Sequence, residues 1–353
     1  MRIRDLAREL GISTGTVSRA LNNRADVNPQ TRMRVLEEAE RLGYAPSHIA
    51  RSLSQGTTNT IALMVRTMAD RSAFDESFFM TIADGLQIAL EDRGMDLILL
   101  ACRNGQDQDA FLKRAVERRI ADGYIISDTR PVDRRIDFLM QREVPFVAFG
   151  RSMSGGAHSW VDMDFEGVAN EAVERLFRLG HRRIALATTQ REFFGNILFT
   201  EGVNQALERR GLPNDESLTF VVEHSEAGGY ELGERIVKSQ NPPTAVVLAR
   251  DTLAIGLYRK LREVNLQPGR DISLIGFRDN PNTRFLNPRL TSFDVHVRDL
   301  GKRLGEVLLE QIELPATERS NARVQQLWPM TVIEGTSDGP LGRAAIRDSD
   351  RVG

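Results

Sequence analysis

The stretch that decides the fold of the first part of the chain runs Ile3-Arg-Asp-Leu-Ala-Arg-Glu-Leu-Gly-Ile-Ser-Thr-Gly-Thr-Val-Ser-Arg-Ala-Leu-Asn22. Its first apolar residues recur at intervals of three and four, which is the spacing of one helix face. Gly11 can end this helix in the left-handed conformation, and Ser13 can cap a second one. Two short helices joined by a turn of this length predict a helix-turn-helix.

A third helix is predicted after this pair. Asn28 can cap it, and Pro29 fits its first position because a missing N–H costs nothing there. Apolar residues at helical spacing follow, and Gly43 ends the run. We therefore expect residues 1–46 to form a small three-helix head.

The second helix carries the chemistry of this head. Its outward residues are small, hydrogen-bonding or cationic: Thr14, Gly15, Thr16, Ser18, Arg19 and Asn22. Small residues let a helix enter a major groove about 12 Å wide, and Arg can pair with both O6 and N7 of guanine. The alternative is an ordinary solvated helix face.

The motifs of this region resemble the DNA-binding head of the lactose and galactose repressor (LacI/GalR) family. The resemblance rests on the stretch from Ile3 to Asn22, on Val27-Asn-Pro-Gln-Thr-Arg32 and on Leu42-Gly-Tyr-Ala-Pro46, in the order and spacing of the family. It implies a homodimer that reads a pseudo-palindromic operator in double-stranded DNA.

The resemblance also implies roles for individual residues of the head. Thr14 and Gly15 fall on two variable base-reading positions, and Arg19 falls on the constant one. Positions that contact or support the phosphates are Thr16, Ser18, Asn22, Thr31 and Tyr44. The expected DNA-binding set also includes Ser13, the cap of the second helix. For Tyr44, packing in the three-helix core is an alternative role.

Residues 47–56 connect the head to the rest of the chain. In the family this segment folds into a hinge helix on DNA, and a leucine at the position of Leu53 enters the minor groove. An apolar wedge of this kind unstacks one base step and bends the duplex. Ser47 stands where the family usually has Asn, and a flexible linker is the alternative.

Charge separates the head from the body. Residues 1–56 hold nine Arg and six Asp or Glu, a local charge of +3, whereas the whole chain of 353 residues has a net charge of −2. A basic head on an acidic body suits a nucleic-acid partner. No apolar run reaches the ~18 residues that span a membrane. With Cys102 as its single cysteine, we expect a cytoplasmic protein with no membrane partner.

Enzyme motifs are absent from the sequence. There is no phosphate-binding Gly-x-x-x-x-Gly-Lys-Ser/Thr loop, no His-Glu-x-x-His, no cysteine pair and no Gly-x-Ser-x-Gly elbow. The five histidines are scattered along the chain. We expect neither an enzyme nor a metal site nor a bound cofactor.

From residue 57 the pattern changes to alternating strands and helices. The short apolar runs predicted as strands are 61–65, 97–100, 123–126, 146–149, 184–187, 219–222, 245–248 and 273–277. Helical segments between them predict an α/β fold with parallel sheets and right-handed crossovers. Two such series in succession predict two lobes, with a ligand cleft at the carboxyl ends of the strands.

The family resemblance extends to about residue 337. Its landmarks include Gly180-His-Arg-Arg-Ile184 and Asp271-Ile-Ser-Leu-Ile-Gly-Phe277. It implies that residues 57–337 form a periplasmic-binding-protein-like domain for effector binding and dimerisation, with crossovers near 150–162, 290–294 and 326–330. The polar residues 338–353 are predicted to form a disordered tail.

The resemblance places an effector, usually a sugar, between the two lobes. Matching the motifs puts Phe78, Phe79 and Ile82 at the mouth of the first lobe and Asp164 at the start of the second. Aromatic faces and a carboxylate suit the C–H faces and hydroxyls of a sugar. Five further positions of the expected pocket depart from the family pattern: Phe165, Phe199, His224, Arg250 and Arg278.

These departures remove one arginine and add two, which leaves three hypotheses open. In the first, the effector is a neutral oligosaccharide or glycoside held by aromatic surface. In the second, it is an anion such as a sugar phosphate or sugar acid, bound by Arg250 and Arg278 through charge-assisted hydrogen bonds. In the third, these arginines pair internally with Asp251 and Asp279 and do not face the ligand.

The sequence therefore predicts a homodimeric transcriptional regulator under allosteric control. The resemblance favours a repressor of a carbohydrate-utilisation operon. The alternative is a cytosolic sugar-binding receptor without a DNA-binding role, because receptors share the two-lobed fold. That alternative leaves the first 56 residues unexplained.

Overall fold

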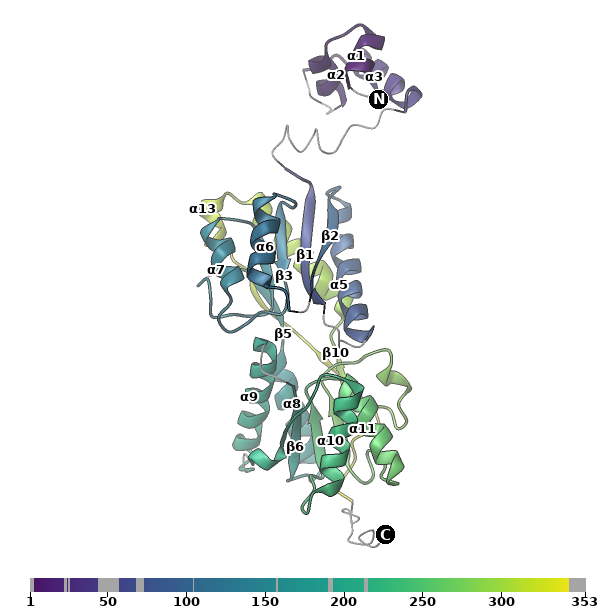
Figure 1. Ribbon diagram of the computed structural model, residues 1–353, viewed down its shortest axis with the longest axis vertical. Coiled ribbons are helices and arrows are strands. Elements are labelled where there is room, and N and C mark those ends of the chain that lie inside the picture. Colours follow the sequence, from purple (N-terminus) through teal and green to yellow (C-terminus); the bar gives the residue numbers. More distant parts are fainter. Residues whose placement is uncertain are drawn as a thin grey trace. The chain divides into compact units, whose positions relative to one another are not determined.

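The computed structural model of the protein forms two compact units, residues 1–59 and residues 60–353, which are described separately (Figure 1). The residues that it describes are 3–21, 24, 26–43, 57–67, 73–103, 105–156, 158–189, 193–212 and 215–342. The predicted hinge helix over 47–56 lies outside these residues, as do three predicted DNA contacts, Asn22, Tyr44 and Leu53.

Three helices make up the described part of the first unit: α1 (Ile3–Leu10), α2 (Thr14–Leu21) and α3 (Pro29–Arg41). The Ser13 hydroxyl accepts the Thr16 N–H at 3.0 Å, and the Asn28 side chain accepts the Gln30 N–H at 2.8 Å. These bonds satisfy backbone donors that the helix itself leaves open. The core of the unit is small and apolar: Leu6, Ala7, Val17, Ala20, Val27, Val35 and Ala39. The predicted three-helix head is confirmed.

The second unit begins with a lobe built on a six-stranded parallel sheet. Its strands are β1 (Thr60–Thr67), β2 (Asp96–Arg103), β3 (Gly123–Ile126), β4 (Phe146–Phe149), β5 (Trp160–Met163) and β11 (Gln325–Trp328). They lie in the order β11-β5-β4-β3-β1-β2. Because both faces of such a sheet must be covered, its central strands are apolar runs.

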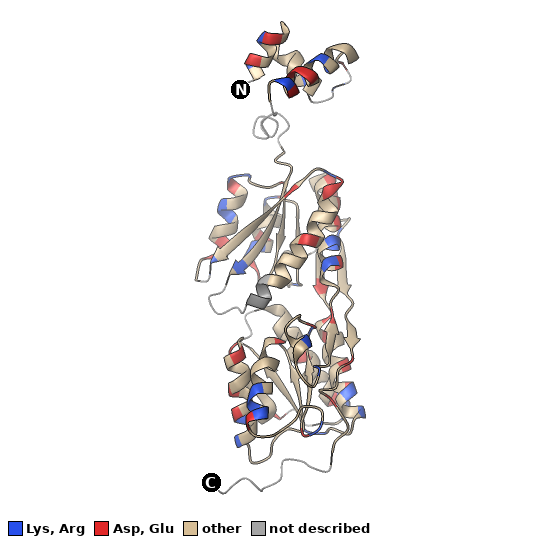
Figure 2. Cartoon of the chain, turned by 90° about the vertical axis from the view of Figure 1, so that its right-hand side faces the viewer, with Lys and Arg blue, Asp and Glu red and all other residues tan. Residues whose placement is uncertain are grey.

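Helices cover both faces of this first-lobe sheet. The helices α5 (Ala73–Glu91) and α12 (Val297–Glu313) share one apolar cluster with it, and α6 (Gln108–Glu117) and α7 (Arg134–Gln141) share another. A short helix, α13 (Ala316–Arg319), follows α12. Charged residues lie mostly on the helices and connecting segments rather than on the strands (Figure 2).

The second lobe repeats the same plan with four parallel strands. They are β6 (Ile184–Thr188), β7 (Thr219–Val221), β8 (Ala245–Leu248) and β9 (Ser273–Gly276), in the order β7-β6-β8-β9. One face is covered by α8 (Phe165–Arg178) and α9 (Phe194–Arg209), and the other by α10 (Glu226–Lys238) and α11 (Thr252–Glu263). Two short 3-10 helices, Glu216–Leu218 and Thr283–Phe285, complete the lobe. The predicted α/β fold with two lobes is confirmed.

The chain passes between the lobes at three places. The first crossing is not at 150–162 as predicted, because β5 pairs with β4 and β11 in the first-lobe sheet. The chain leaves that sheet only after Met163 and enters α8 at Phe165. The other crossings adjoin an antiparallel pair, β10 (Ser292–Asp294) with β12 (Thr331–Ile333): one runs from β10 to α12, the other from β11 to β12.

The chain stays packed against the second lobe beyond residue 337. The Asp338 carboxylate pairs with Arg175 at 2.5 Å and also accepts the Thr291 hydroxyl. The Leu341 N–H donates to the Leu179 carbonyl at 2.9 Å. The prediction of disorder is therefore wrong for 338–342, because the partners of these polar residues lie far away in the sequence. Residues 343–353 lie outside the described part.

No helix in the described part of the chain has the length and the apolar character that crossing a membrane requires.

Candidate functional site

The first candidate site is the exposed face of α2 in the head. Val17 and Ala20 are buried in the head core, which turns Thr14, Gly15 and Arg19 to solvent. Thr16 and Ser18 are half-buried at the edges of this face, and Thr31 is half-buried on α3. The exposed surface thus consists of small polar groups around one guanidinium, as a helix that enters a major groove requires.

Two details of this face bear on DNA reading. Beyond its chain neighbours, the nearest atom to a Cβ placed on Gly15 would be the Ser13 hydroxyl oxygen at 3.7 Å, so the surface around Gly15 is open. The Arg19 Nε lies 3.7 Å from a carboxylate oxygen of Asp26, and both side chains are more than half exposed. This exposed pair leaves the terminal guanidinium nitrogens of Arg19 available for a base edge.

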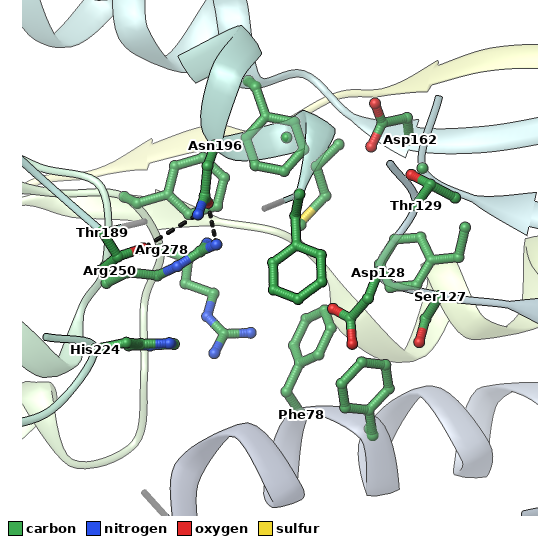
Figure 3. Close-up of a pocket in the computed structure, with 18 of the residues that line it drawn as sticks. Phe78, Ser127, Asp128, Thr129, Asp162, Thr189, Asn196, His224, Arg250 and Arg278 are labelled. Atoms are coloured by element: carbon green, nitrogen blue, oxygen red, sulfur yellow. Dashed lines mark hydrogen bonds between the residues drawn. The ribbon is translucent and has the colours of Figure 1, made fainter. Parts of the chain in front are cut away.

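The second candidate site is a cavity of about 530 Å³ inside the second unit. Both lobes line it, mostly from the carboxyl ends of strands and the segments that follow them (Figure 3). That is the position at which parallel α/β sheets bind ligands.

Phenylalanine rings form much of the cavity wall. On the first-lobe side, the Phe78 ring stacks on Phe149 at 6.1 Å and meets the edge of Phe79 at 5.5 Å between centroids. On the second-lobe side, Phe165 and Phe277 stack at 5.1 Å with nearly parallel planes. Such surfaces bind apolar faces without directional demands, so they suit the C–H faces of a ring-shaped ligand.

Two guanidinium groups reach into the second-lobe side of the cavity (Figure 3). Arg278 donates from Nε to the Asp251 carboxylate at 3.1 Å, and its guanidinium carbon lies 4.3 Å from the centroid of the Phe78 ring of the first lobe. Arg250 donates to the Asn196 amide oxygen, and that amide donates to Thr189 at 3.1 Å. Both arginines are therefore held in place by neighbours while they line the cavity.

Acidic groups balance these arginines. The cavity lining includes the carboxylates of Asp128, Asp162, Glu223 and Glu231. Asp162 is buried, and burial raises its pKa to about 6 even though Arg151 bonds to it at 2.8 Å. The cavity walls thus carry four acids and two arginines, Arg250 and Arg278, and one of these is already paired with Asp251.

The structure places the predicted effector residues in two groups. Those that line the cavity are Phe78, Phe79, Phe165, His224, Arg250 and Arg278. Three do not line it: Ile82, Asp164 and Phe199. Ile82 is fully buried between the sheet and α12, and Phe199 packs its ring edge-on against Phe277 at 5.3 Å. Asp164 caps α8 by accepting the Gly167 N–H at 2.9 Å.

The structure agrees only in part with the hypothesis that both arginines pair internally. Asp251 accepts from Arg278, whereas Asp279 pairs with Arg284 at 2.5 Å and Arg250 donates to Asn196. Pairing also does not remove Arg278 from the cavity, since its guanidinium still lies over the Phe78 ring.

Sequence reasoning missed a group of lining residues at strand ends, at the first crossing and at the start of α9: Asp128, Thr129, Asp162, Met163, Phe193, Asn196 and Phe277. One signal could have found part of this group. Residues that directly follow a buried strand, such as Asp128 and Thr129 after β3, lie at the ligand-binding edge of a parallel sheet.

A helix-turn-helix head followed by a two-lobed unit with a ligand cavity defines a DNA-binding regulator that senses a small molecule. Known families agree with this class. The description "Bacterial regulatory proteins, lacI family" matches residues 2–47, and "Periplasmic binding protein-like domain" matches residues 173–337. The HTH-type transcriptional regulator AglR of Rhizobium meliloti (strain 1021) is 31% identical over 346 residues, which cover 96% of this chain and 95% of AglR.

Solved structures give the same result. The transcriptional regulator CelR in complex with cellobiose is 25% identical, with a TM-score of 0.70, and the match covers 96% of this chain and 99% of CelR. The lac repressor dimer bound to operator and the anti-inducer ONPF shares the fold with a TM-score of 0.83 at 21% identity, over 96% of this chain and 98% of the repressor. The chain belongs to the LacI family of bacterial transcriptional regulators, as its sequence predicts. It is a DNA-binding transcriptional regulator.

Proposed function

We propose that this protein is a homodimeric repressor that releases or binds its operator in response to a neutral sugar or glycoside. The proposal rests on the presence of two features in the same chain. One is an open α2 face with Arg19 at its centre, and the other is a phenylalanine-lined cavity. It works in the cytoplasm, where its DNA is, and it is not an enzyme. The lac repressor, whose fold this chain shares, was solved as a dimer bound to operator.

The charge balance of the cavity supports a neutral effector over an anion. Four acids and two arginines line the walls, and some of these charges are paired: Asp162 with Arg151, Glu231 with Arg235, and Arg278 with Asp251. A phosphate in this space would meet more negative charge than positive charge at short range, where charges interact strongly. A neutral sugar can instead donate hydroxyls to the carboxylates and accept from the arginines.

The size of the cavity supports an effector with more than one ring. The cavity has a volume of about 530 Å³. One pyranose ring would leave much of that space unfilled. A disaccharide or an aryl glycoside would fill more of it, and the relative CelR was solved with the disaccharide cellobiose.

Calorimetry on the full-length protein tests the effector class. We expect a neutral disaccharide, from a set of cellobiose, maltose, trehalose and sucrose, to bind in a 1:1 ratio, and the matching sugar phosphates to bind at least about tenfold more weakly. Replacing Arg250→Gln should weaken the neutral sugar because it removes a hydroxyl donor. Tighter binding of the phosphates, lost in Arg250→Gln, would establish the anionic effector instead.

Selection from a random duplex library tests the DNA-binding part. The wild-type protein should enrich a pseudo-palindromic sequence. Arg19→Ala should lose discrimination at one symmetric base pair by about 1–3 kcal/mol, which is the usual size of a bidentate base contact. Its affinity for scrambled duplex should change much less. If the wild type enriches no sequence, with or without the four disaccharides, the protein is a sugar receptor without a DNA-binding role.

A further inference from the structure

Arg151, Asp162 and Glu166 form a set of ion pairs across the first crossing between the lobes, which we call the brace. Arg151 follows β4 and donates from Nε to Asp162 at 2.8 Å. Its two terminal nitrogens donate to the two oxygens of Glu166 at 2.9 and 2.5 Å. Asp162 belongs to β5 of the first lobe and Glu166 to the first turn of α8 in the second. Arg151 thus connects both sides of the crossing, and only three residues separate Asp162 from Glu166.

The brace is built from groups with different degrees of burial. The side chain of Asp162 is 3% exposed, that of Arg151 19% and that of Glu166 39%. The guanidinium carbon of Arg151 also lies 5.9 Å from the centroid of the Trp160 ring. A planar fork that holds two carboxylates fixes their relative position far more tightly than a single point charge can.

The same crossing forms part of the cavity wall. Asp162, Met163 and Phe165 all line the cavity, whereas Arg151 is outside its lining. An effector hydroxyl that donates to Asp162 therefore acts on the carboxylate that Arg151 holds from the other side. Any rotation of α8 relative to β5 must also change the separation of Asp162 and Glu166, because so few residues lie between them.

We propose that Arg151 is a positioning residue that couples the occupation of the cavity to the relative orientation of the two lobes, and through it to operator affinity. Arg151 does not contact the effector. A change in the hydrogen bonding of Asp162 shifts Arg151, and Arg151 in turn shifts α8 through its bonds to Glu166. The inference rests on the proposed effector cavity. It adds the contact across the first crossing whose two arrangements a ligand must stabilise unequally to change the rest of the molecule.

Glu166→Gln is the decisive variant. It weakens the second-lobe arm of the brace and leaves the buried Arg151–Asp162 pair intact, so the protein should fold as the wild type does. Arg151→Lys keeps the charge but loses the fork. The matched control is Arg178→Lys, because Arg178 pairs with Glu171 at 2.9 Å within α8 and does not span the crossing.

The first measurement needs no effector. Spin labels are placed on cysteines introduced at Val132 in the first lobe and Asn204 in the second, in a Cys102→Ser background, and the distance distribution between them is recorded on the full-length protein. We expect Glu166→Gln and Arg151→Lys to shift or broaden the distribution, and Arg178→Lys to leave it unchanged. A distribution that stays the same in both brace variants would overturn the proposal.

The second measurement uses the duplex enriched by the wild type and the disaccharide that binds it most tightly of the four tested. In the brace variants, the factor by which that disaccharide changes operator affinity should fall at least about fivefold, a change within the usual range of allosteric coupling. The affinity for the disaccharide itself should change less than about threefold. An unchanged coupling factor would contradict the inference. If none of the four disaccharides binds the wild type, the proposed effector class fails, and the label distances still decide the role of Arg151.

Discussion

Two buried aspartates show how the surroundings of a residue decide its charge. Asp133 and Asp162 are both buried, and each bonds to one arginine. Burial pushes the pKa of both upward. For Asp133, the bonds and charge of Arg135 and two backbone N–H groups outweigh burial, so its pKa is lowered. For Asp162, burial prevails over the bonds and charge of Arg151, the nearby charge of Glu166 adds to its effect, and the pKa rises to about 6.

The raised pKa of Asp162 predicts an unusual pH dependence of stability. In the unfolded chain the pKa returns to about 3.8, so between about pH 4 and 6 the folded protein holds a proton that the unfolded one does not. The contribution of this group to stability therefore increases as the pH falls. Relative to Asp162→Asn, the wild type should gain roughly 3 kcal/mol at most in unfolding free energy between pH 7 and pH 4, as measured by urea titration.

Asp271 provides the control with the opposite sign. The hydrogen bond from Arg270 lowers its pKa, so its stabilising contribution is present at neutral pH and is lost as the pH falls. The difference between wild type and Asp271→Asn should accordingly shrink on acidification. If the difference for Asp162→Asn also shrinks, Asp162 is an ordinary ion-paired carboxylate.

At the scale of elements, glycines set how closely the helices of each lobe approach. Gly85 of α5 faces the backbone oxygen of Arg298 at the start of α12, and Gly301 of α12 faces the backbone oxygen of Ile82. A Cβ at either glycine would overlap that oxygen. The two helices therefore pack nearly backbone to backbone, which brings Phe78 on α5 to the cavity and lets α12 link the lobes.

Gly85→Ala should destabilise the second unit by about 1–3 kcal/mol, because the added methyl group must force α5 away from α12. Urea unfolding followed by fluorescence of the two tryptophans, Trp160 and Trp328, measures the effect in the lobe concerned. The control is Gly15→Ala on the open face of α2, which should stabilise the head by up to about 1 kcal/mol, since alanine favours a helix; because the two tryptophans lie outside the head, its unfolding is followed by circular dichroism. Equal effects at the two positions would refute close helix packing at Gly85.

The sequence was informative where an element decides its own structure. The caps Ser13 and Asn28 and the apolar runs of β1, β3 and β8 are local signals, and the structure has these elements as predicted. The strands β5 and β11 were not predicted, because they are short and partly polar and each gains its structure from a partner far along the chain. The crossing at Met163 was misplaced for this reason.

The candidate site was predictable to the same extent. Several aromatic residues and arginines that the motifs place in the pocket, such as Phe78 and Arg278, line the cavity. Ile82 and Phe199 went to the core instead, because an apolar side chain next to a cavity can point either way and periodicity does not distinguish the two. The brace of Arg151 could not be foreseen, since it depends on where the sheet ends and α8 begins.

At the scale of the whole molecule, the free energy of effector binding must be coupled to the free energy of operator binding. The head has its own apolar core and the second unit has its own, so the two binding sites lie in separately packed units. Regulation then requires that the effector bind one lobe orientation more tightly than another, and that operator DNA do the same. The size of the response is set by these differences in affinity and not by the tightness of either ligand alone.

Thermodynamic linkage turns this into a test on the intact protein. If the bound disaccharide changes operator affinity by some factor, the operator must change disaccharide affinity by the same factor. We expect calorimetric titrations of the sugar with and without saturating duplex to give the factor found by DNA binding with and without sugar. The controls are Arg19→Ala and a scrambled duplex. The variant should bind the sugar as the wild type does, and adding the scrambled duplex should leave that sugar affinity unchanged. Two factors that differ beyond error would mean that the sugar and the operator do not act on a common pair of states.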